Sequence, residues 1–320
     1  MYMFKYILKR LGLLIMTFSI IMIICFVLIK LLPVVIDLPI GKDHELLKAQ
    51  LEGRGYYDPI PVQFINYLKR IFLHGDLGVC VNLPEFRNQP VWDVFVQKLP
   101  PTVLINIYSS LIAVPIGILL GILAALKKNK WQDHAISTGV MLFISVPSFI
   151  YAFLVQFIFC FLLGLFPLTM NAGFDYFSVS MFKSMMPAVI SLSFGSIAGY
   201  ARYTRAELTE VLTSEFMLLA RTKGLTKAQA TTRHALRNAM VPIFPSIIGE
   251  FISVMSGSLI IEQIFSIPGV GGLYLAAINT QDYDSFMMLS GFYILIGLLA
   301  GIVIDISYGI IDPRIRMGAK

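Results

Sequence analysis

The chain has 320 residues, of which 57% are hydrophobic and only 14% are charged. A soluble domain carries about 25% charged residues, so the composition argues against a water-soluble enzyme. The net charge of +6 could indicate nucleic acid, but no basic and aromatic binding pattern accompanies it, and we expect no nucleic-acid partner. Basic residues on the cytoplasmic side explain such a charge in a membrane protein. The sequence therefore predicts an all-α integral membrane protein.

Six apolar stretches are each able to hold the roughly 20 helical residues that cross a bilayer. In chain order they are residues 11–29, 100–126, 135–174, 184–201, 238–261 and 285–304. The third is longer than one span and contains Pro147, so we expect one helix over 135–163, kinked at Pro147, with a re-entrant loop as the weaker alternative. No proline lies between Pro187 and Pro242, which favours continuation of the fourth span as helix beyond residue 201.

The distribution of basic residues predicts that both termini are cytoplasmic. The inner segments would be 1–10, 127–134, 202–237 and 312–320, which carry 16 Lys and Arg against 8 in the outer segments. The first apolar run lacks a small-residue cleavage site, so we interpret it as a retained anchor. This gives an N-terminus and first helix at 1–32, an extracytoplasmic cap at 33–99 and a five-helix core at 100–320 that includes the loop 202–237. We expect short amphipathic helices in the cap, for example around 62–72, with an ordinary solvated loop as the alternative.

The loop 202–237 has the pattern of a compact helix-turn-helix. Ser214 is placed to cap a short helix on whose face Phe216, Leu219, Ala220 and Lys223 would lie together. Gly224 can supply a left-handed end to that helix, and Thr226 with Gln229 predicts a capping box for the next one. A solvated connector is the plainer interpretation of the same composition.

Several motifs in this order resemble one protein family. The run from Ala220 to Gly224 and the run from His234 to Pro242 are similar to the cytoplasmic EAA-type loop of ABC importer permeases of the dipeptide, oligopeptide and nickel family. The same order holds for motifs outside the loop: Gly75-Asp-Leu-Gly78, Pro90-Val91, Leu99-Pro100 with Thr102, Arg202 with Arg205, Glu262 with Phe265 and Pro268-Gly269, Asp282-Tyr283, and Asp312-Pro-Arg-Ile-Arg316. The resemblance covers nearly the whole chain and is strongest to the B-type subunit of oligopeptide and dipeptide permeases.

The resemblance implies a type I ABC importer permease in a bacterial cell membrane, which is not an enzyme and binds no cofactor. Its partners would be membrane lipid, a second homologous permease, two cytoplasmic ATPases that use ATP and Mg²⁺, and an extracytoplasmic peptide-binding protein. The helix ending at Gly224 would dock in an ATPase and couple ATP hydrolysis to movement of oligopeptides or dipeptides. The residues implicated in coupling are Phe216, Leu219, Ala220, Lys223, Gly224, Arg237, Asn238 and Pro242.

Two positions depart from the family pattern. Leu218 stands where other ABC importers have the acidic residue that names the loop, so no salt bridge is expected there. Val34-Val35-Ile36 follows Pro33 where Gly-Asp-Pro is usual, which leaves the first outer turn open.

Membrane-depth polar residues are candidates for the translocation path. Glu250 is the one charge inside an expected span, where burial costs at least ~2.5–3.5 kcal/mol, so it should face a cavity or a partner. Glu250 could either line the translocation path or make a structural hydrogen bond. The same two roles are open for Ser253 and Ser256, because serine in membrane helices often bonds to its own backbone.

Other transport classes fit the sequence less well. Nickel or another small solute is an alternative within the family, but no histidine spacing suggests a metal site. An ion-driven secondary transporter would show repeats and several membrane-depth acids. The chain contains no phosphate loop and no catalytic motif of the metalloprotease or serine hydrolase kind.

Overall fold

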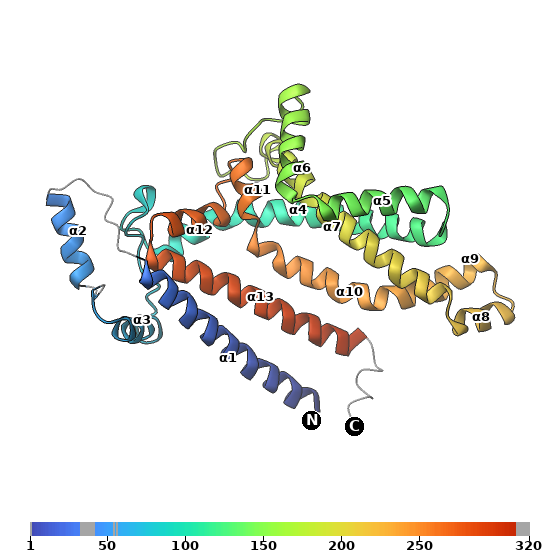
Figure 1. Cartoon of the computed structure of the whole chain (residues 1–320), viewed down its shortest axis with the longest axis horizontal. Helices are drawn as coiled ribbons and strands as arrows, with labels where there is room; N and C mark the ends of the chain where they lie inside the picture. The colour runs from blue at the N-terminus through green and yellow to red at the C-terminus, as the bar shows by residue number, and fades with distance from the viewer. Residues whose placement is uncertain (1, 33–41, 54, 56, 312–320) are drawn as a thin grey trace. The chain divides into compact units, whose positions relative to one another are not determined.

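The computed structural model describes residues 2–32, 42–53, 55 and 57–311, and the regular elements in this part of the chain are helices (Figure 1). The chain divides into two compact units, one of Met1–Pro100 with Pro268–Leu298 and one of Pro101–Ile267 with Leu299–Lys320. Residues 268–298 thus group by their contacts with the first hundred residues. The expected division into 1–32, 33–99 and 100–320 stays a prediction. The departure from the family at Val34-Val35-Ile36 and the motif at 312–316 lie outside the described residues.

Within the described residues, four helices are long and apolar enough to cross a membrane, and a bent helix pair brings the number to as many as five. The four are α1 (Tyr2–Leu31), α4 (Val91–Leu126), α7 (Val179–Leu212) and α13 (Tyr283–Ile311). They correspond to the first, second, fourth and sixth expected spans. The predicted continuation of the fourth span as helix is confirmed, since α7 runs to Leu212 without interruption. The total of six spans stays a prediction.

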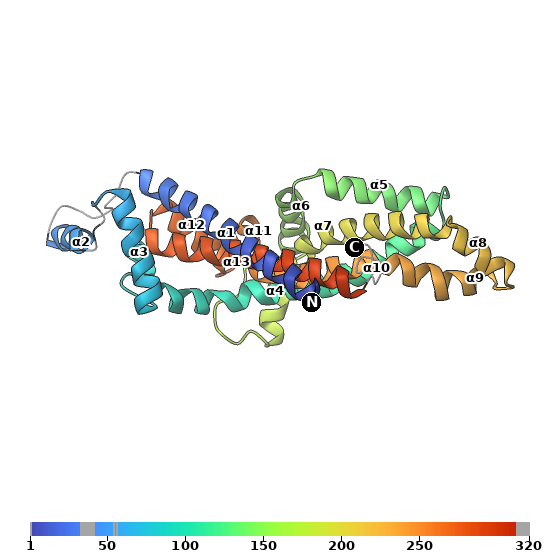
Figure 2. The same ribbon diagram turned by 90° about the horizontal axis from the view of Figure 1, so that it is seen from below.

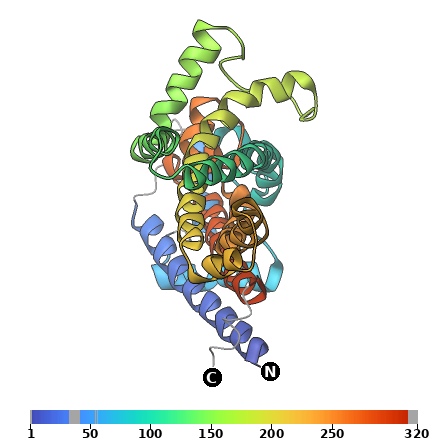
Figure 3. The same ribbon diagram turned by 90° about the vertical axis from the view of Figure 1, so that its right-hand side faces the viewer.

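The third expected span is broken. α5 (Trp131–Ser145) is followed by Val146, whose φ of −86° and ψ of 128° are extended, and α6 (Ser148–Val155) starts directly after Pro147. The π-helical segment η2 (Gln156–Leu162) completes the second limb, which turns by 104° from α5. In Figures 1 and 3 this limb, in bright green, rises away from α5. A proline disfavours helical backbone at the preceding residue. The kink expected at Pro147 is thus a full break in the helix, and the two limbs fit either one broken span or a re-entrant loop.

The fifth expected span is a shorter helix followed by an irregular segment. α10 (Leu236–Ser253) includes two prolines and is not among the helices that meet the requirements for crossing a membrane. After it come the 3₁₀ turn η4 (Val254–Ser256), Gly257 with a φ of +63°, and α11 (Leu259–Ile264). A residue with a left-handed backbone ends a right-handed helix. The predicted continuous span over 238–261 was therefore wrong beyond Ser253.

The first unit joins one end of α1 to a short helix and to the start of α13. The helix α3 (Ile60–His74) packs Phe64 and Tyr67 against Phe26 of α1, with ring centroids 5.1 and 5.5 Å apart. Phe72 on α3 is 80% exposed. A helix is thus present where one was expected, around 62–72. The remaining elements of this unit are α2 (Lys42–Gly53), η1 (Pro84–Phe86) and α12 (Val270–Asn279).

Small residues bring α4 and α7 close together in the second unit. They recur at every fourth position of α4, at Ser109, Ala113, Gly117, Gly121 and Ala125. A Cβ added at Gly117 would lie 2.7 Å from Cβ of Tyr200, and one at Gly121 would lie 2.7 Å from the carbonyl oxygen of Ala201. Glycine at these positions therefore lets the two backbones approach within a distance that any side chain would prevent.

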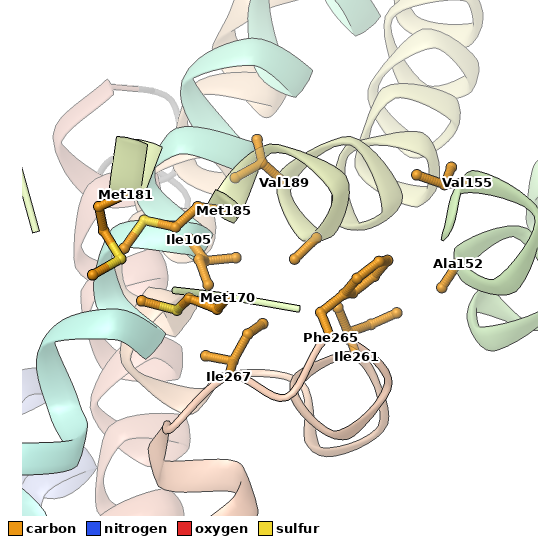
Figure 4. Packing of buried hydrophobic residues seen from close by; sticks show 11 residues of the cluster. Ile105, Ala152, Val155, Met170, Met181, Met185, Val189, Ile261, Phe265 and Ile267 are labelled. Atoms are coloured by element: carbon orange, nitrogen blue, oxygen red, sulfur yellow. The ribbon is translucent and has the colours of Figure 1, made fainter. Parts of the chain in front are cut away.

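A buried apolar cluster holds the middle of the second unit together (Figure 4). It joins residues from α4, α6, α7, the segment before α7 and the segment around α11. They are Ile105, Ala152, Val155, Met170, Met181, Met185, Ala188, Val189, Ile261, Phe265 and Ile267. Polar contacts tie the irregular segments to it, because the amide N–H of Met170 donates to the carbonyl oxygen of Phe265 at 2.9 Å. The Gln156 side chain donates to the Ile264 carbonyl oxygen at 3.0 Å.

Candidate coupling loop

The loop expected to couple transport to ATP folds as a helix-turn-helix at the end of α7. α8 (Glu215–Thr222) is followed by α9 (Lys227–Ala230) and by the π-helical segment η3 (Thr231–Ala235), which leads into α10. Figure 2 shows α8 and α9 beside each other at the end of α7. Two local predictions are confirmed. Gly224 has a φ of +90°, and the Thr226 hydroxyl and Gln229 amide bond to each other's backbone N–H groups as a capping box.

The N-terminal end of α8 differs in one detail from the expectation. Ser214 occupies the N-cap position, but its side chain makes no capping bond to α8. Its hydroxyl instead donates to the carbonyl oxygen of Val211 at 2.6 Å. Ser214 therefore secures the end of α7 and not the start of α8.

α8 has a buried face and an exposed apolar face. Met217 and Ala220 are buried in a cluster with alanines from α4, α9, η3 and α10. Phe216, Leu218 and Leu219 are 42%, 65% and 56% exposed. We expected Ala220 on the same face as Phe216 and Leu219. It packs inward instead, whereas Phe216 and Leu219 are exposed. Lys223 and Gly224 are also exposed.

The remaining expected coupling residues lie on the segment that follows. Arg237 and Asn238 are exposed at the start of α10. Pro242 is half-buried, and its carbonyl oxygen accepts hydrogen bonds from Tyr203 of α7 at 3.2 Å and Tyr308 of α13 at 3.3 Å. Pro242 therefore lies at a junction of three helices, away from the exposed apolar face of α8.

The expected path residues are placed on α10 and just beyond it. Glu250 is half-buried and accepts a hydrogen bond from the Ser196 hydroxyl of α7 at 2.9 Å. Ser253 is exposed, and its hydroxyl donates to the Gly249 carbonyl oxygen of its own helix at 2.9 Å. The side chain of Ser256 lies outside the described part of the chain. The polar contact of Glu250 is therefore a helix–helix hydrogen bond, and that of Ser253 stays within α10.

Motif residues from distant parts of the sequence meet in the second unit. The Thr102 hydroxyl donates to Oε1 of Glu262 at 2.8 Å, and both side chains are buried. The left-handed Gly257 lies against this pair, because an added Cβ would be 2.8 Å from Cγ2 of Thr102. The turn after α10 therefore packs closely against the buried hydrogen bond between Thr102 and Glu262.

The motif residue Asp282 is held by backbone donors in the first unit. The amide N–H groups of Val81 and Asn82 donate to Oδ2 of Asp282 at 2.6 and 2.7 Å. Burial raises the pKa of Asp282 above its ordinary value, against the effect of these N–H groups, which favour the carboxylate. The neighbouring Cys80 is fully buried, and burial raises the pKa of its thiol to about 11. This thiol is therefore almost entirely protonated near neutral pH.

Sequence reasoning missed a buried ion pair near the loop. Arg205 of α7 binds Asp133 of α5 with two parallel hydrogen bonds, of which Nη2 to Oδ2 measures 2.8 Å. The Asn129 amide N–H also donates to Asp133, whose side chain is only 2% exposed. Arg205 entered the sequence analysis only as part of a motif. Both charged residues fall in segments expected to be cytoplasmic, 127–134 and 202–237, so neither stood out as a charge at membrane depth.

No group of three or more His, Cys, Asp or Glu side chains within the described residues is arranged to hold a metal ion.

These features define a multi-pass helical membrane protein with a helix-turn-helix loop after its long helix α7. Residues 117–317 match the family described as the binding-protein-dependent transport system inner membrane component. Residues 3–106 match the N-terminal family of the same transport systems. The chain belongs to this family of transport permeases. It is accordingly a non-catalytic transport subunit of the ABC type.

Curated relatives match over almost the full length. The dipeptide transport system permease protein DppB is 34% identical in Lactococcus lactis subsp. cremoris and 33% identical in Bacillus subtilis, over 98% and 99% of this chain and all of each relative. The oligopeptide transport system permease protein OppB of Salmonella typhimurium is 32% identical over 98% of this chain and all of its own. A crystal structure titled as an amino acid ABC transporter with histidines shares the fold at 18% identity, with a TM-score of 0.50 over 67% of this chain and 92% of that one.

Proposed function

We propose that this chain is the permease subunit of an ATP-driven importer of dipeptides or oligopeptides, and that α8 transmits force from an ATPase. The single observation that carries the coupling role is the exposed apolar face of α8, formed by Phe216, Leu218 and Leu219. Apolar side chains gathered on one exposed face of a helix are suited to a hydrophobic groove of a partner. The buried Met217 and Ala220 fix the opposite face to the bundle. A push on α8 therefore moves α7 and α10 with it.

The peptide substrate rests on the relatives, which are named as dipeptide and oligopeptide transport permeases over the full chain. Nickel, the alternative within the family, gains no support from the described residues, which contain no cluster of metal-binding side chains.

The energy source and the assembly follow from the family membership. ATP and Mg²⁺ would be used by two cytoplasmic ATPase subunits and not bound by this chain. A second, homologous permease would complete the path, and an extracytoplasmic binding protein would deliver the peptide. Peptide movement then requires that the helix bundle has two discrete packing arrangements. The ATPases would shift the population of permease molecules from one arrangement to the other.

The test of the coupling role is a Leu219→Asp variant of the reconstituted complex. A carboxylate on the exposed face of α8 would have to be desolvated in an apolar groove, so the ATPase subunits should no longer copurify and peptide uptake into vesicles should be lost. Phe177→Asp is the matched control, because Phe177 is also an exposed apolar residue, at 83%, in a loop remote in sequence from α8. It should retain the ATPases. Wild-type copurification and uptake by Leu219→Asp would overturn the coupling role.

A further inference from the structure

A cavity of about 460 Å³ lies between α5 and α7, close to the buried Asp133–Arg205 pair. Its lining includes Ser137, Val140, Met141 and Ile144 from α5, and Arg202 and Arg205 from α7. The cavity is large enough for a small organic group, since ligand sites commonly measure roughly 300–1,000 Å³. Its walls are apolar on the α5 side and basic on the α7 side.

The cavity carries one positive charge that its own residues do not neutralise. Arg205 is bound to Asp133 on the α5 side, so those two charges cancel. Arg202 is exposed, and no carboxylate in the described part of the chain forms an ion pair with it. Its guanidinium can therefore offer two parallel N–H donors to an anionic oxygen pair. A phosphate or carboxylate group is the chemistry that fits.

The position of Arg202 along α7 places it at a membrane boundary. At 1.5 Å per residue, the helix from the apolar Ser184 region to Arg202 covers about 27 Å, close to the ~30 Å thickness of the hydrocarbon. Trp131, at the start of α5, is 74% exposed, as is typical of tryptophan at the headgroup level. The exposed Lys127, Lys128 and Lys130 immediately precede it. Basic residues of this kind attract anionic lipid.

The apolar wall of the cavity continues onto the outside of α5. Met141 and Ile144, which line the cavity, are 63% and 45% exposed. An anionic group bound at Arg202 would therefore have a long apolar surface beside it, running from the membrane boundary into the hydrocarbon. Only a ligand with an anionic head and an apolar chain uses both walls.

We propose that this cavity binds an anionic phospholipid of the surrounding membrane. The phosphodiester accepts hydrogen bonds from the Arg202 guanidinium, and one acyl chain lies along Val140, Met141 and Ile144. The lipid fills the space between α5 and α7 without contacting α8. This site is independent of the peptide substrate and of the ATPases.

The test is native mass spectrometry of the purified full transport complex titrated with phosphatidylglycerol or phosphatidylcholine of the same acyl chains. Wild-type protein should retain phosphatidylglycerol preferentially, and Arg202→Gln should weaken this retention about fivefold, as expected for one basic residue at a membrane surface. Arg202→Lys should keep most of it. Arg233→Gln removes the same charge from an exposed position on η3, outside the cavity, and should leave retention unchanged.

A second variant separates the lipid from free phosphate. Met141→Ser should weaken phosphatidylglycerol retention, and millimolar inorganic phosphate should not displace the lipid. The proposal would be overturned if the two lipids were retained equally, or if Arg202→Gln and Arg233→Gln lost retention equally. It would also be overturned if inorganic phosphate displaced the lipid, or if the second permease filled the cavity in the complex. These measurements of lipid retention do not require transport activity. Their outcome is therefore independent of the test of the coupling role of α8.

Discussion

Each of the two units is secured by an arginine–aspartate pair in which the guanidinium donates two hydrogen bonds to the carboxylate. Arg205 with Asp133 joins α7 to α5, and Arg70 with Asp284 joins α3 to the start of α13, each through two parallel hydrogen bonds. The partners are 72 and 214 residues apart. Sequence patterns report on neighbours within a helical turn or a loop, and neither separation leaves such a pattern. Only the fold identifies the partners.

Removing one partner of the Asp133–Arg205 pair should destabilise the protein. For Asp133→Asn we expect a loss of about 2 kcal/mol, less than the roughly 3–5 kcal/mol for a fully buried pair, because the Arg205 side chain is 34% exposed. The measurement is thermal unfolding of the detergent-solubilised protein. Asp175→Asn, at an exposed position, should change stability by less than about 0.5 kcal/mol. Equal effects of the two substitutions would show that the pair contributes nothing.

At the scale of helices, local signals were sufficient wherever the determining residues were neighbours. The capping box at Thr226 and Gln229, the left-handed Gly224 and the amphipathic α3 were all predicted from short patterns. The effect of proline was less predictable from sequence. Pro187 lies inside the continuous α7, whereas the chain turns sharply at Pro147.

The two prolines have different surroundings. A proline within a helix leaves a carbonyl group without its usual donor, and whether the helix bends or breaks depends on what satisfies that carbonyl group. Pro187 removes the N–H donor that would bond to the carbonyl oxygen of Lys183, yet α7 continues through it as one helix. At the α5–α6 turn, Val146 is extended, and the Gln156 side chain beyond it bonds to two other segments. Those contacts exist only once the bundle has formed.

The close approach of α4 and α7 gives a prediction at this scale. Gly117→Ala should destabilise the protein by about 1–3 kcal/mol, because the new methyl group would meet Cβ of Tyr200 and the backbone of Ile197, neither of which can move freely. Gly139→Ala on α5 is the matched control, since an added Cβ there meets nothing within 4 Å. It should be neutral or slightly stabilising. Thermal unfolding of both variants in detergent measures the difference, and an equal response would contradict close packing at Gly117.

For the whole molecule, the untested expectation is six spans with cytoplasmic termini. In the part of the chain that the structure describes, four helices and one bent pair satisfy the requirements for spanning, and α10 is a further candidate. Apolarity alone does not decide this number, because a proline-containing helix that carries Glu250 can cross a bilayer when neighbouring helices satisfy its polar groups.

Site-directed labelling of single cysteines tests the orientation. In a variant whose Cys25, Cys80 and Cys160 are replaced by serine, Phe177→Cys should react with a membrane-impermeant maleimide in intact cells. Thr222→Cys in the same background should react only after the membrane is opened, since α8 is expected on the cytoplasmic side. Both positions are exposed, so their accessibility to the reagent depends on the side of the membrane. Labelling of Thr222→Cys in intact cells would reverse the orientation.

The turn that follows α8 has one further consequence. Gly224 has open space around it, and its constraint is the positive φ alone. An L-alanine there fits by volume but has the wrong handedness for the backbone, whereas its mirror-image form, D-alanine, favours a positive φ. What the chain requires at this point is chirality and not smallness, so a semisynthetic protein with D-alanine at 224 would keep the shape of the turn that L-alanine strains.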